Sequence, residues 1–481
     1  MITDQKQKES AGVGKNSEAG FMKRKVKRIH FVGIGGIGMS GIAEVLLNLG
    51  YKISGSDAVS SETTRRLRNL GALVAHGHAP DNIGNADVVV TSTAVRGDNP
   101  EVMEAHRKNV PVIPRAEMLA ELLKMKFSIA VSGSHGKTTT TSMLSAILAQ
   151  GGLDPTMVIG GKLASIGSNA RLGDGDIIVA EADESDGSFL KLSPVIAAIT
   201  NIDREHLDYY PGIEEIKAAF LTFANIVPFY GCTVICIDDE NVRSIAASIK
   251  RRVTTYGITE PADYTASEIR LLDTKTVYRL LHRGEDLGEM ELIVPGLFNV
   301  YNSLAAIAIG RELGMDTGTI REGLAAFTGV QRRLELKGTA GGITVVDDYG
   351  HHPTEIRATL SAARQRWKGR LIVVFQPHRF TRTQALFDEF IGSFQDADVL
   401  IINDIYPASE EPIPGINSAA LWASIKENGH PCVEYIARVP KTVEYLMETA
   451  VPGDTIITLG AGGVYKVGEA FLERMKKESK K

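Results

Sequence analysis

Residues 133–138 read Gly-Ser-His-Gly-Lys-Thr and have the composition of a phosphate-binding loop. They follow the apolar run 129–131 and precede a stretch of helical periodicity. Between a strand and a helix, backbone N–H groups hold phosphate oxygens, Lys137 can neutralise the β and γ phosphates, and Thr138 can offer its hydroxyl to magnesium. The loop departs from the common motif because Val131 stands where the first glycine usually lies. The alternative is a glycine turn that only caps a helix.

A second glycine loop, residues 33–38, reads Gly-Ile-Gly-Gly-Ile-Gly and follows another apolar run, with Asp57 at the end of the next one. Gly33, Gly35 and Gly38 would let a pyrophosphate approach a helix N-terminus. The motif by itself favours a nicotinamide or flavin dinucleotide. Any pyrophosphate would fit, including that of a UDP-sugar.

Acidic and histidine side chains follow two further apolar runs. The run 176–180 ends in Glu181, at the edge where a nucleotide-binding sheet presents its magnesium ligand. We interpret the next acidic residues as mostly solvated or capping: Asp183, Glu184 and Asp186. His206 comes just after the run 195–199, and this position favours a metal role over a structural one, although magnesium prefers oxygen ligands.

Polar clusters also follow apolar runs near the C-terminus, at 347–353 and 376–382. Arg379 and Arg382 would suit a clamp for a phosphoryl group or a carboxylate. Gly460-Ala-Gly-Gly could bring backbone amides to an anion or be only a turn. Surface loops with caps and turns are the alternative for both polar clusters.

The elements that must position these residues alternate along the chain. Short β-branched runs are predicted to be buried strands at 28–32, 87–91, 128–131, 176–180, 233–237 and 371–375. Amphipathic stretches such as 41–49 and 139–149 are predicted to be helices. This alternation predicts an α/β fold with parallel sheets flanked by helices.

The chain has 481 residues, which is too long for one ordinary core and indicates about three domains. Because the two glycine loops open separate strand–helix units, we place a boundary near Lys124. A charged, then glycine-rich stretch before the predicted strand 343–347 marks the next boundary. The predicted division is a disordered leader, 1–26, followed by domains 27–124, 125–334 and 335–481.

Composition excludes several classes of function. With 43% hydrophobic and 23% charged residues and a net charge of −5, the chain lacks the basic balance typical of nucleic-acid or anionic-membrane partners. Three cysteines indicate a reducing compartment, and core packing is favoured over a metal site for Cys232 and Cys236. No apolar run reaches the ~18 residues of a membrane span, and there is no signal-type segment. We predict a cytoplasmic protein.

Together these motifs resemble the Mur ligase family over nearly the whole chain, from Lys27 to Lys466. The segments that carry the resemblance are 33–38, 134–141, 181–186, 201–206, 299–302, 331–333, 347–353 and 376–379. The resemblance implies a Rossmann-like UDP-binding domain, a central P-loop ATPase-like domain with a parallel sheet, and a Rossmann-like C-terminal α/β domain that closes over ATP.

The activity implied by the resemblance is ADP-forming ligation of L-alanine to the carboxylate of UDP-N-acetylmuramate, through an acyl phosphate, in peptidoglycan synthesis. The implied cofactors are ATP and Mg²⁺ or Mn²⁺. The expected partners are these small molecules only, without nucleic acid or membrane insertion, and the expected state is a monomer or a weak homodimer.

The resemblance also assigns residues. The UDP-sugar would be held by Gly33, Gly35, Gly36, Gly38, Asp57 and Ser92. ATP would be held by Gly133, Ser134, His135, Gly136, Lys137, Thr138, Thr139, Asn299, Asn302, Arg333 and Asp348. The metal ligands would be Thr138, Glu181 and His206. The amino acid would meet Tyr349, His351, His378 and Arg379, and catalysis would rest on Lys137, His206, His351, Arg379 and Arg382. Some relatives carry a carbamylated lysine after the metal histidine, but Leu221 and its neighbours offer none.

Three alternatives stay open from the sequence. A recycling ligase would attach a whole tripeptide to the same sugar, although the segments 181–186 and 201–206 favour alanine addition. An NAD-dependent oxidoreductase would explain the loop at Gly33 but not the second phosphate loop. A UDP-sugar-binding protein with a degenerate ATPase would have lost Lys137, Glu181 or His206, and all three are present.

Overall fold

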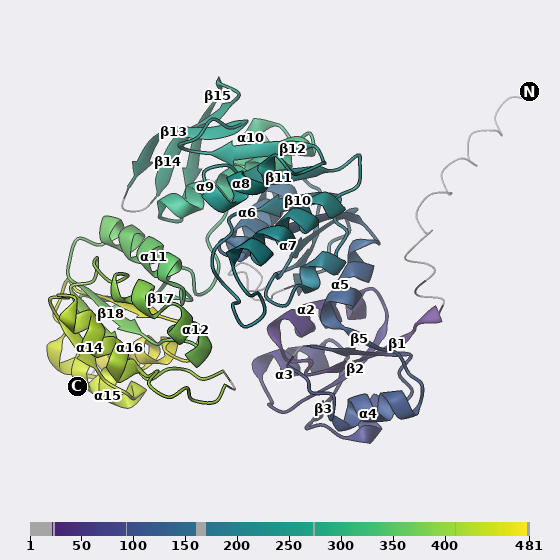
Figure 1. The fold of residues 1–481 in the computed structure, drawn as a ribbon, viewed down its shortest axis with the longest axis horizontal. Helices are drawn as coiled ribbons and strands as arrows, with labels where there is room; N and C mark the ends of the chain where they lie inside the picture. Colours follow the sequence, from purple (N-terminus) through teal and green to yellow (C-terminus); the bar gives the residue numbers. More distant parts are fainter. Residues whose placement is uncertain are drawn as a thin grey trace, which may run out of the picture.

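The structure is a computed structural model that describes residues 22, 25–92, 94–159, 170–272, 275–408 and 410–478. The predicted leader lies almost wholly outside these described residues. The chain forms three lobes that follow one another in sequence (Figure 1). Each lobe contains a sheet with parallel strands and flanking helices, so the predicted α/β class is confirmed. Across the described residues, no helix is long and apolar enough to cross a membrane.

The first lobe is built on a five-stranded parallel sheet in the order β3-β2-β1-β4-β5. Its strands are β1 (Arg28–Val32), β2 (Lys52–Asp57), β3 (Leu73–His76), β4 (Val88–Thr91) and β5 (Val112–Pro114). Its helices are α2 (Ile37–Asn48), α3 (Glu62–Asn69), η1 (Pro80–Ile83), α4 (Pro100–Arg107) and α5 (Arg115–Leu123). The strand order reverses beside β1, so the loop at Gly33 lies at the point where open α/β sheets bind ligands.

The central lobe is built on a ten-stranded sheet in the order β15-β14-β13-β12-β11-β10-β6-β9-β7-β8. Its strands are β6 (Phe127–Ser132), β7 (Thr156–Val158), β8 (Ala170–Arg171), β9 (Ile177–Glu181), β10 (Ile196–Ile199), β11 (Cys232–Cys236), β12 (Val253–Gly257), β13 (Tyr264–Leu271), β14 (Thr276–His282) and β15 (Glu285–Leu292). Its helices are α6 (Lys137–Gln150), η2 (Ser188–Lys191), α7 (Ile213–Ile226), α8 (Glu240–Ala246), α9 (Leu297–Glu312) and α10 (Thr317–Ala325). Strands β9, β6 and β10 are parallel neighbours, so the segments that follow them meet at one edge.

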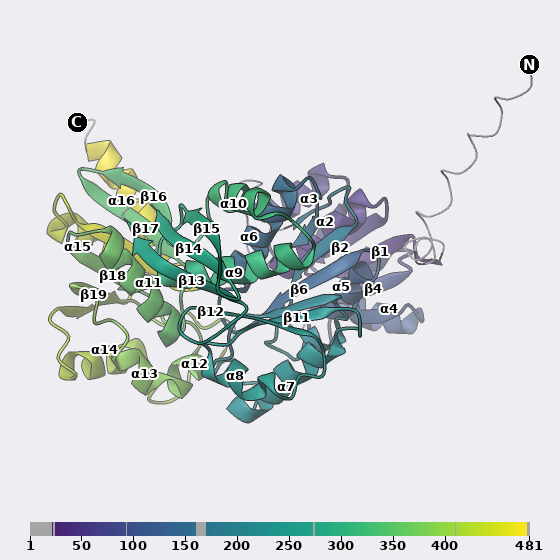
Figure 2. The ribbon, with the colours of Figure 1, turned by 90° about the horizontal axis from the view of Figure 1, so that it is seen from above.

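The C-terminal lobe has a six-stranded sheet in the order β16-β17-β21-β18-β19-β20, with only β16 antiparallel. Its strands are β16 (Glu335–Ala340), β17 (Ile343–Asp348), β18 (Leu371–Phe375), β19 (Val399–Ile402), β20 (Val433–Tyr435) and β21 (Thr455–Leu459). Its helices are α11 (Pro353–Arg366), α12 (Phe380–Ala385), α13 (Phe387–Ile391), α14 (Ser418–Glu427), α15 (Val439–Thr449) and α16 (Tyr465–Glu478). Figure 2 shows this lobe beside the central one, seen from above.

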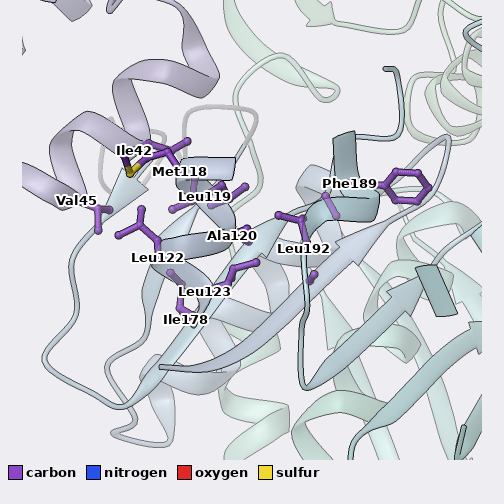
Figure 3. Close-up of a cluster of buried hydrophobic side chains, with 14 of the residues drawn as sticks. Ile42, Val45, Met118, Leu119, Ala120, Leu122, Leu123, Ile178, Phe189 and Leu192 are labelled. Atoms are coloured by element: carbon purple, nitrogen blue, oxygen red, sulfur yellow. The ribbon is translucent and has the colours of Figure 1, made fainter. Parts of the chain in front are cut away.

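The first two lobes share one hydrophobic core. Helix α5 places Leu119, Leu122 and Leu123 in a buried cluster that also contains Ile42 of α2 and Ile178 of β9 (Figure 3). The C-terminal lobe packs around two clusters of its own. The lobe that carries the phosphate loop is therefore joined to the first lobe by apolar packing.

Candidate functional site

The phosphate loop joins β6 to α6 and requires glycine at two positions. Gly133 has φ +133°, and a Cβ there would meet the Thr200 hydroxyl at 2.0 Å. Gly136 has φ +83°, and a Cβ there would meet Asn302 Oδ1 at 2.4 Å. The loop is fixed from the neighbouring strand, because the Ser134 amide donates to the Asn201 carbonyl at 3.1 Å. Its backbone is thus held open at the helix N-terminus, as phosphate binding requires.

The ammonium group of Lys137 is buried among oxygen atoms. Its Nζ donates to the Gly133 carbonyl at 2.5 Å, the Ser134 carbonyl at 3.2 Å and Glu184 Oε1 at 2.7 Å. Burial opposes the charged form, but the charges of Glu184 and Asp183 outweigh it and raise the pKa of Lys137. Lys137 is therefore a fixed positive charge at the phosphate loop.

Glu184 is the exception to the interpretation that most of these acidic residues are solvated or capping, because it is only 2% exposed and pairs with Lys137. The backbone after β9 turns its side chain toward the loop of the adjacent strand β6. Asp183 and Asp186 fit the interpretation, since their carboxylates accept from the Ser185 amide at 3.1 Å and the Ser188 amide at 3.0 Å.

Carboxylate oxygens surround the beginning of α6 in an arrangement that fits a divalent cation. The Thr138 hydroxyl lies 3.0 Å from both oxygens of Glu181. Among the described residues, Glu184 Oε2 and Glu205 Oε1 are buried without a hydrogen-bond partner. Glu184, Glu205 and His206 place their ligand atoms within 4.8 Å of one another. Hard oxygen ligands with one hydroxyl are what Mg²⁺ and Mn²⁺ accept.

His206 sits in the left-handed backbone region with φ 55°, which turns its side chain back toward Glu184. Its Nε2 lies 3.4 Å from Glu184 Oε1 and 3.6 Å from Glu205 Oε2. Burial by itself would lower the pKa of His206, but the hydrogen bond to Glu184 and the charge of Glu205 raise it. The two carboxylates beside His206 therefore favour a positive charge at this position, either a proton on the imidazole or a metal ion.

Two asparagines of α9 lie beside the phosphate loop. Asn302 Oδ1 accepts from the Thr140 hydroxyl at 3.2 Å, and its Nδ2 donates to Asn299 Oδ1 at 3.2 Å. Both asparagine side chains are buried, and Asn299 Nδ2 donates to the Pro295 carbonyl. The two asparagines predicted to hold ATP are thus packed against the loop that would hold the phosphates.

The loop at Gly33 is positioned by Asp57. The Gly35 amide donates to Asp57 Oδ2 at 2.8 Å, and the Gly33 amide donates to the Ser56 carbonyl at 2.8 Å. A carboxylate that already accepts from the loop orients that loop for a ligand. Arg115, at the beginning of α5, lies against Gly38, where a Cβ would meet its Nη1 at 2.8 Å. Ser92 follows the end of β4, which is the parallel neighbour of β1, so it lies at the same edge of the sheet as the loop at Gly33.

Arg333, whose side chain is 30% exposed, and the buried Asp348 lie where the central lobe joins the C-terminal lobe. Asp348 accepts from the Leu334 amide at 2.8 Å and the Gly350 amide at 2.7 Å, and burial raises its pKa to about 6. Arg333 Nη1 donates to Glu355 Oε1 at 3.0 Å. Both residues, which were predicted to bind ATP, therefore form contacts at the junction of the two lobes in this structure.

The predicted amino-acid residues gather at the edge of the C-terminal sheet. The His351 and His378 rings lie 5.8 Å apart, and Arg382 Nη1 lies 3.2 Å from His378 Nδ1. Burial, together with the charge of Arg382, lowers the pKa of His351 to about 4, and burial with neighbouring positive charges lowers that of His378 to about 3. Both imidazoles are therefore neutral at pH 7. Tyr349 stacks edge-on with His351 at 5.4 Å.

A cavity of about 240 Å³ lies between the loop after His206 and helix α12. Its walls are Arg204, Glu205, His206, Leu207, Asp208, Arg379, Thr381, Arg382, Gln384, Ala385 and Leu386. Arg379 Nη1 reaches across it to Asp208 Oδ2 at 3.1 Å. The cavity places the two predicted arginines, Arg379 and Arg382, beside the cluster of Glu184, Glu205 and His206. An anionic amino acid held by these arginines would meet an activated acyl group at this cluster.

Several residues of the site were missed by sequence reasoning. They are Arg115, Glu184, Asp203, Glu205 and Glu355. Glu184 left a usable signal, since a buried lysine in a phosphate loop needs a counter-charge and an acidic segment follows the adjacent strand. No local signal marks Arg115, Asp203 or Glu355, because each of these residues contacts residues of another lobe.

Three sequence profiles match the chain in succession. They are described as "Mur ligase family, catalytic domain" at residues 28–127, "Mur ligase middle domain" at 131–310, and "Mur ligase, glutamate ligase domain" at 332–462. The three matches follow the three lobes, and the chain also carries the two glycine loops and the cluster of Glu184, Glu205 and His206. The chain therefore belongs to the Mur ligase family.

Among its relatives, UDP-N-acetylmuramate--L-alanine ligase of Syntrophus aciditrophicus is 65% identical over 455 residues, which cover 95% of each chain. The crystal structure of UDP-N-acetylmuramate-alanine ligase from Thermotoga maritima is 31% identical with a TM-score of 0.81, over 94% of this chain and 99% of that one. A murein peptide ligase from Psychrobacter arcticus has the same fold, with 24% identity and a TM-score of 0.70, over 93% and 98%.

Proposed function

We propose that this chain ligates L-alanine to the carboxylate of UDP-N-acetylmuramate and converts ATP to ADP and phosphate. The observation that carries the proposal is the cavity between the lobes, which brings Arg379 and Arg382 next to His206 and the carboxylates beside the phosphate loop. The 65% identical relative carries the name of this activity. A peptidoglycan role follows from the substrate.

Each lobe supplies one substrate site in this proposal. The loop 33–38, with Asp57, Ser92 and the adjacent Arg115, holds the UDP diphosphate. The phosphate loop holds ATP, with Asn299 and Asn302 toward the adenine and Arg333 and Asp348 near the rest of the nucleotide. The cavity beside Arg379, with Tyr349, His351 and His378 nearby, holds the amino acid, because guanidinium groups bind carboxylates in a bidentate manner.

The reaction needs two transfers. In the first, a carboxylate oxygen of the sugar acid bonds to the γ-phosphorus of ATP and the bond from that phosphorus to the ADP oxygen breaks. In the second, the uncharged amine attacks the acyl carbon, phosphate leaves with the bonding electrons, and the amine loses a proton. Lys137 stabilises the charge that develops on the phosphoryl oxygens, and Arg379 and Arg382 orient the amino acid.

His351 and His378 are neutral at pH 7, so the positive charge on this side of the cavity comes from Arg379 and Arg382. Neither transfer needs a covalent bond to the protein. The work of the site is therefore positioning and electrostatic stabilisation.

Thr138, Glu181 and His206 would hold Mg²⁺ or Mn²⁺, with Glu184 and Glu205 close by. Such an ion would neutralise phosphate charge and so reduce the repulsion between the sugar-acid carboxylate and ATP. Without it, the unpartnered oxygens of Glu184 and Glu205 would add to that repulsion.

The domain division 27–124, 125–334 and 335–481 is part of the proposal and is supported by the three separate sheets. We further propose a cytoplasmic location, where ATP is supplied, a monomer or weak homodimer, and a C-terminal lobe that closes over ATP. Sedimentation of the purified protein would test the oligomeric state directly.

The test of the proposed function is ADP release by the purified protein with ATP, Mg²⁺ and UDP-N-acetylmuramate. It is measured without an acceptor, with L-alanine, and with the tripeptide that a recycling ligase would use. Alanine-dependent turnover is the expected result. Turnover only with the tripeptide would assign the chain to recycling, and no turnover with either would overturn the proposal.

A further inference from the structure

Five polar residues meet where the C-terminal lobe touches the phosphate loop. They form an interdomain cluster of His135, Asp203, His352, Thr354 and Glu355. His135 belongs to the phosphate loop itself, and Asp203 belongs to the loop after β10. The other three lie at the beginning of α11, directly after the predicted amino-acid residues Tyr349 and His351.

Asp203 is one of the residues that connect the two lobes. Its Oδ2 lies 3.0 Å from His135 Nε2 on the central lobe and accepts from the Thr354 hydroxyl at 2.7 Å on the C-terminal lobe. The Asp203 amide also donates to the Ser134 hydroxyl at 2.8 Å. Asp203 therefore contacts the phosphate loop through both its carboxylate and its amide, and its carboxylate also contacts Thr354 and His352 of the C-terminal lobe.

Glu355 extends the connection into the amino-acid loop. Its Oε2 accepts from the His351 amide at 3.0 Å, and its Oε1 lies 3.7 Å from His135 Nδ1. The same residue accepts from Arg333 at the junction of the lobes. The hydrogen bond to Asp203 and the nearby carboxylate of Glu355 outweigh burial and raise the pKa of His135 to about 10, so a positive charge lies between two carboxylates.

A metal site is the other reading of this cluster, since His135, Asp203 and His352 place ligand atoms within 4.8 Å of one another. Two of the ligand atoms are already engaged. His352 Nδ1 accepts from the Thr354 amide at 3.3 Å as the cap of α11, and Asp203 Oδ2 accepts from the Thr354 hydroxyl. Among the described residues, His135 Nδ1 and His352 Nε2 are buried without a hydrogen-bond partner, but the shared carboxylate oxygen of Asp203 already serves the contact between the lobes.

We propose that Asp203 is a positioning residue that fixes the amino-acid loop, residues 349–355, over the phosphate loop through Thr354. This inference rests on the proposed function. In this assignment Asp203 contacts none of the three substrates. It sets where His351 and its neighbours stand when the amine attacks the acyl phosphate, which is the second transfer and not the first.

The main test is Thr354→Val, which keeps the shape of the side chain and removes the hydroxyl that Asp203 accepts. We expect kcat/KM for alanine to fall about tenfold, the effect of losing one hydrogen bond to a charged group. The KM values for ATP and UDP-N-acetylmuramate should not change. The amount of ADP formed in one turnover without alanine should also stay the same, because that step precedes the amine.

Three further variants complete the test. Thr354→Ser retains the hydroxyl and should restore wild-type constants. Asp203→Asn also weakens the contact with His135 of the phosphate loop, so it should lower kcat/KM for alanine and raise the KM for ATP as well. Thr319→Val is the matched control, since the Thr319 hydroxyl also donates to a carboxylate, that of Asp316, but within one lobe. It should leave all constants unchanged.

Wild-type constants in Thr354→Val, or an equal loss in the single ADP turnover without alanine, would overturn the positioning role. A wild-type protein that shows no alanine-dependent ADP release would instead overturn the proposed function. The two failures are therefore separated by the wild-type measurement.

Discussion

Leucines of α5 join the first lobe to the central lobe, whereas ion pairs join the central lobe to the C-terminal lobe. Leu119, Leu122 and Leu123 are each no more than 3% exposed and belong to a core that continues through both lobes. Across the other boundary lie the ion pairs of Arg379 with Asp208 and Arg204 with Glu389, and the half-buried Phe298 of α9 packs against the C-terminal core. Buried apolar area stabilises an interface strongly, and exposed ion pairs contribute little.

The contrast matches the order of events that the proposed reaction needs. The UDP-sugar and ATP must be held at a fixed separation, so the lobes that carry the loops at Gly33 and Gly133 benefit from a rigid boundary. The amino-acid lobe must admit substrate and release product. Interfaces between domains that are small and polar permit such motion.

Lys137→Met should have the largest effect, and it falls on activity. Removal of the charge that stabilises the transferred phosphoryl group should lower kcat/KM by about 10³-fold, measured as alanine-dependent ADP release. Lys441→Met, at an exposed lysine of α15, should leave activity unchanged. Retention of more than a tenth of the activity in Lys137→Met would place the phosphates elsewhere.

Leu119→Ala should have the largest effect on stability. A buried leucine in the shared core should cost about 3 kcal/mol of unfolding free energy on truncation. In denaturant unfolding followed by hydrogen exchange, the first two lobes should lose protection together. The same substitution at Leu421, in the core of the C-terminal lobe, should lower protection in that lobe alone. Loss confined to the first lobe in Leu119→Ala would refute a shared core.

Acid should weaken the C-terminal lobe through His378. Its pKa is lowered to about 3 in the folded chain, and a histidine in an unfolded chain titrates near 6.5. The unfolded state therefore binds the proton first, so this contribution to stability is complete above about pH 6.5 and is lost as pH falls toward 3.

Between pH 7.5 and 5 the wild type should lose about 2 kcal/mol of stability in the C-terminal lobe relative to His378→Gln. Denaturant unfolding at both pH values measures the difference. His106→Gln, on the exposed face of α4, should show no such difference from the wild type. Parallel pH curves for the wild type and His378→Gln would show that the ring is not held neutral.

Asp208→Asn combined with Glu389→Gln should have the smallest effect on stability. Both ion pairs are well exposed, so their loss should change the unfolding free energy by less than about 0.5 kcal/mol. The lobes should nevertheless separate more readily, which would raise the radius of gyration in small-angle scattering. A loss of several kcal/mol would remove the contrast between the two boundaries.

Local sequence predicted much of this fold because the signals are local. The predicted strands at 28–32 and 371–375 have the same bounds in the structure, and the predicted helices at 41–49 and 139–149 lie within or next to α2 and α6. Apolar runs and glycine spacing are set by the backbone itself. The assigned roles of the individual site residues stay predictions.

Glu184 marks the point where local reasoning ended. Its segment looks solvated in sequence, but the adjacency of β9 and β6 brings it to Lys137. Asp203 and Glu355 are even further from the phosphate loop along the chain, and both contact that loop at His135.

The sequence by itself determined the α/β class, the two glycine loops and the strand ends at which chemistry-bearing residues stand, because each depends on the local preferences of neighbouring residues. Only the tertiary structure decided which charges face one another and which boundary is apolar or ionic. Strand order and the packing of lobes set those contacts between distant residues, and no spacing along the chain encodes them.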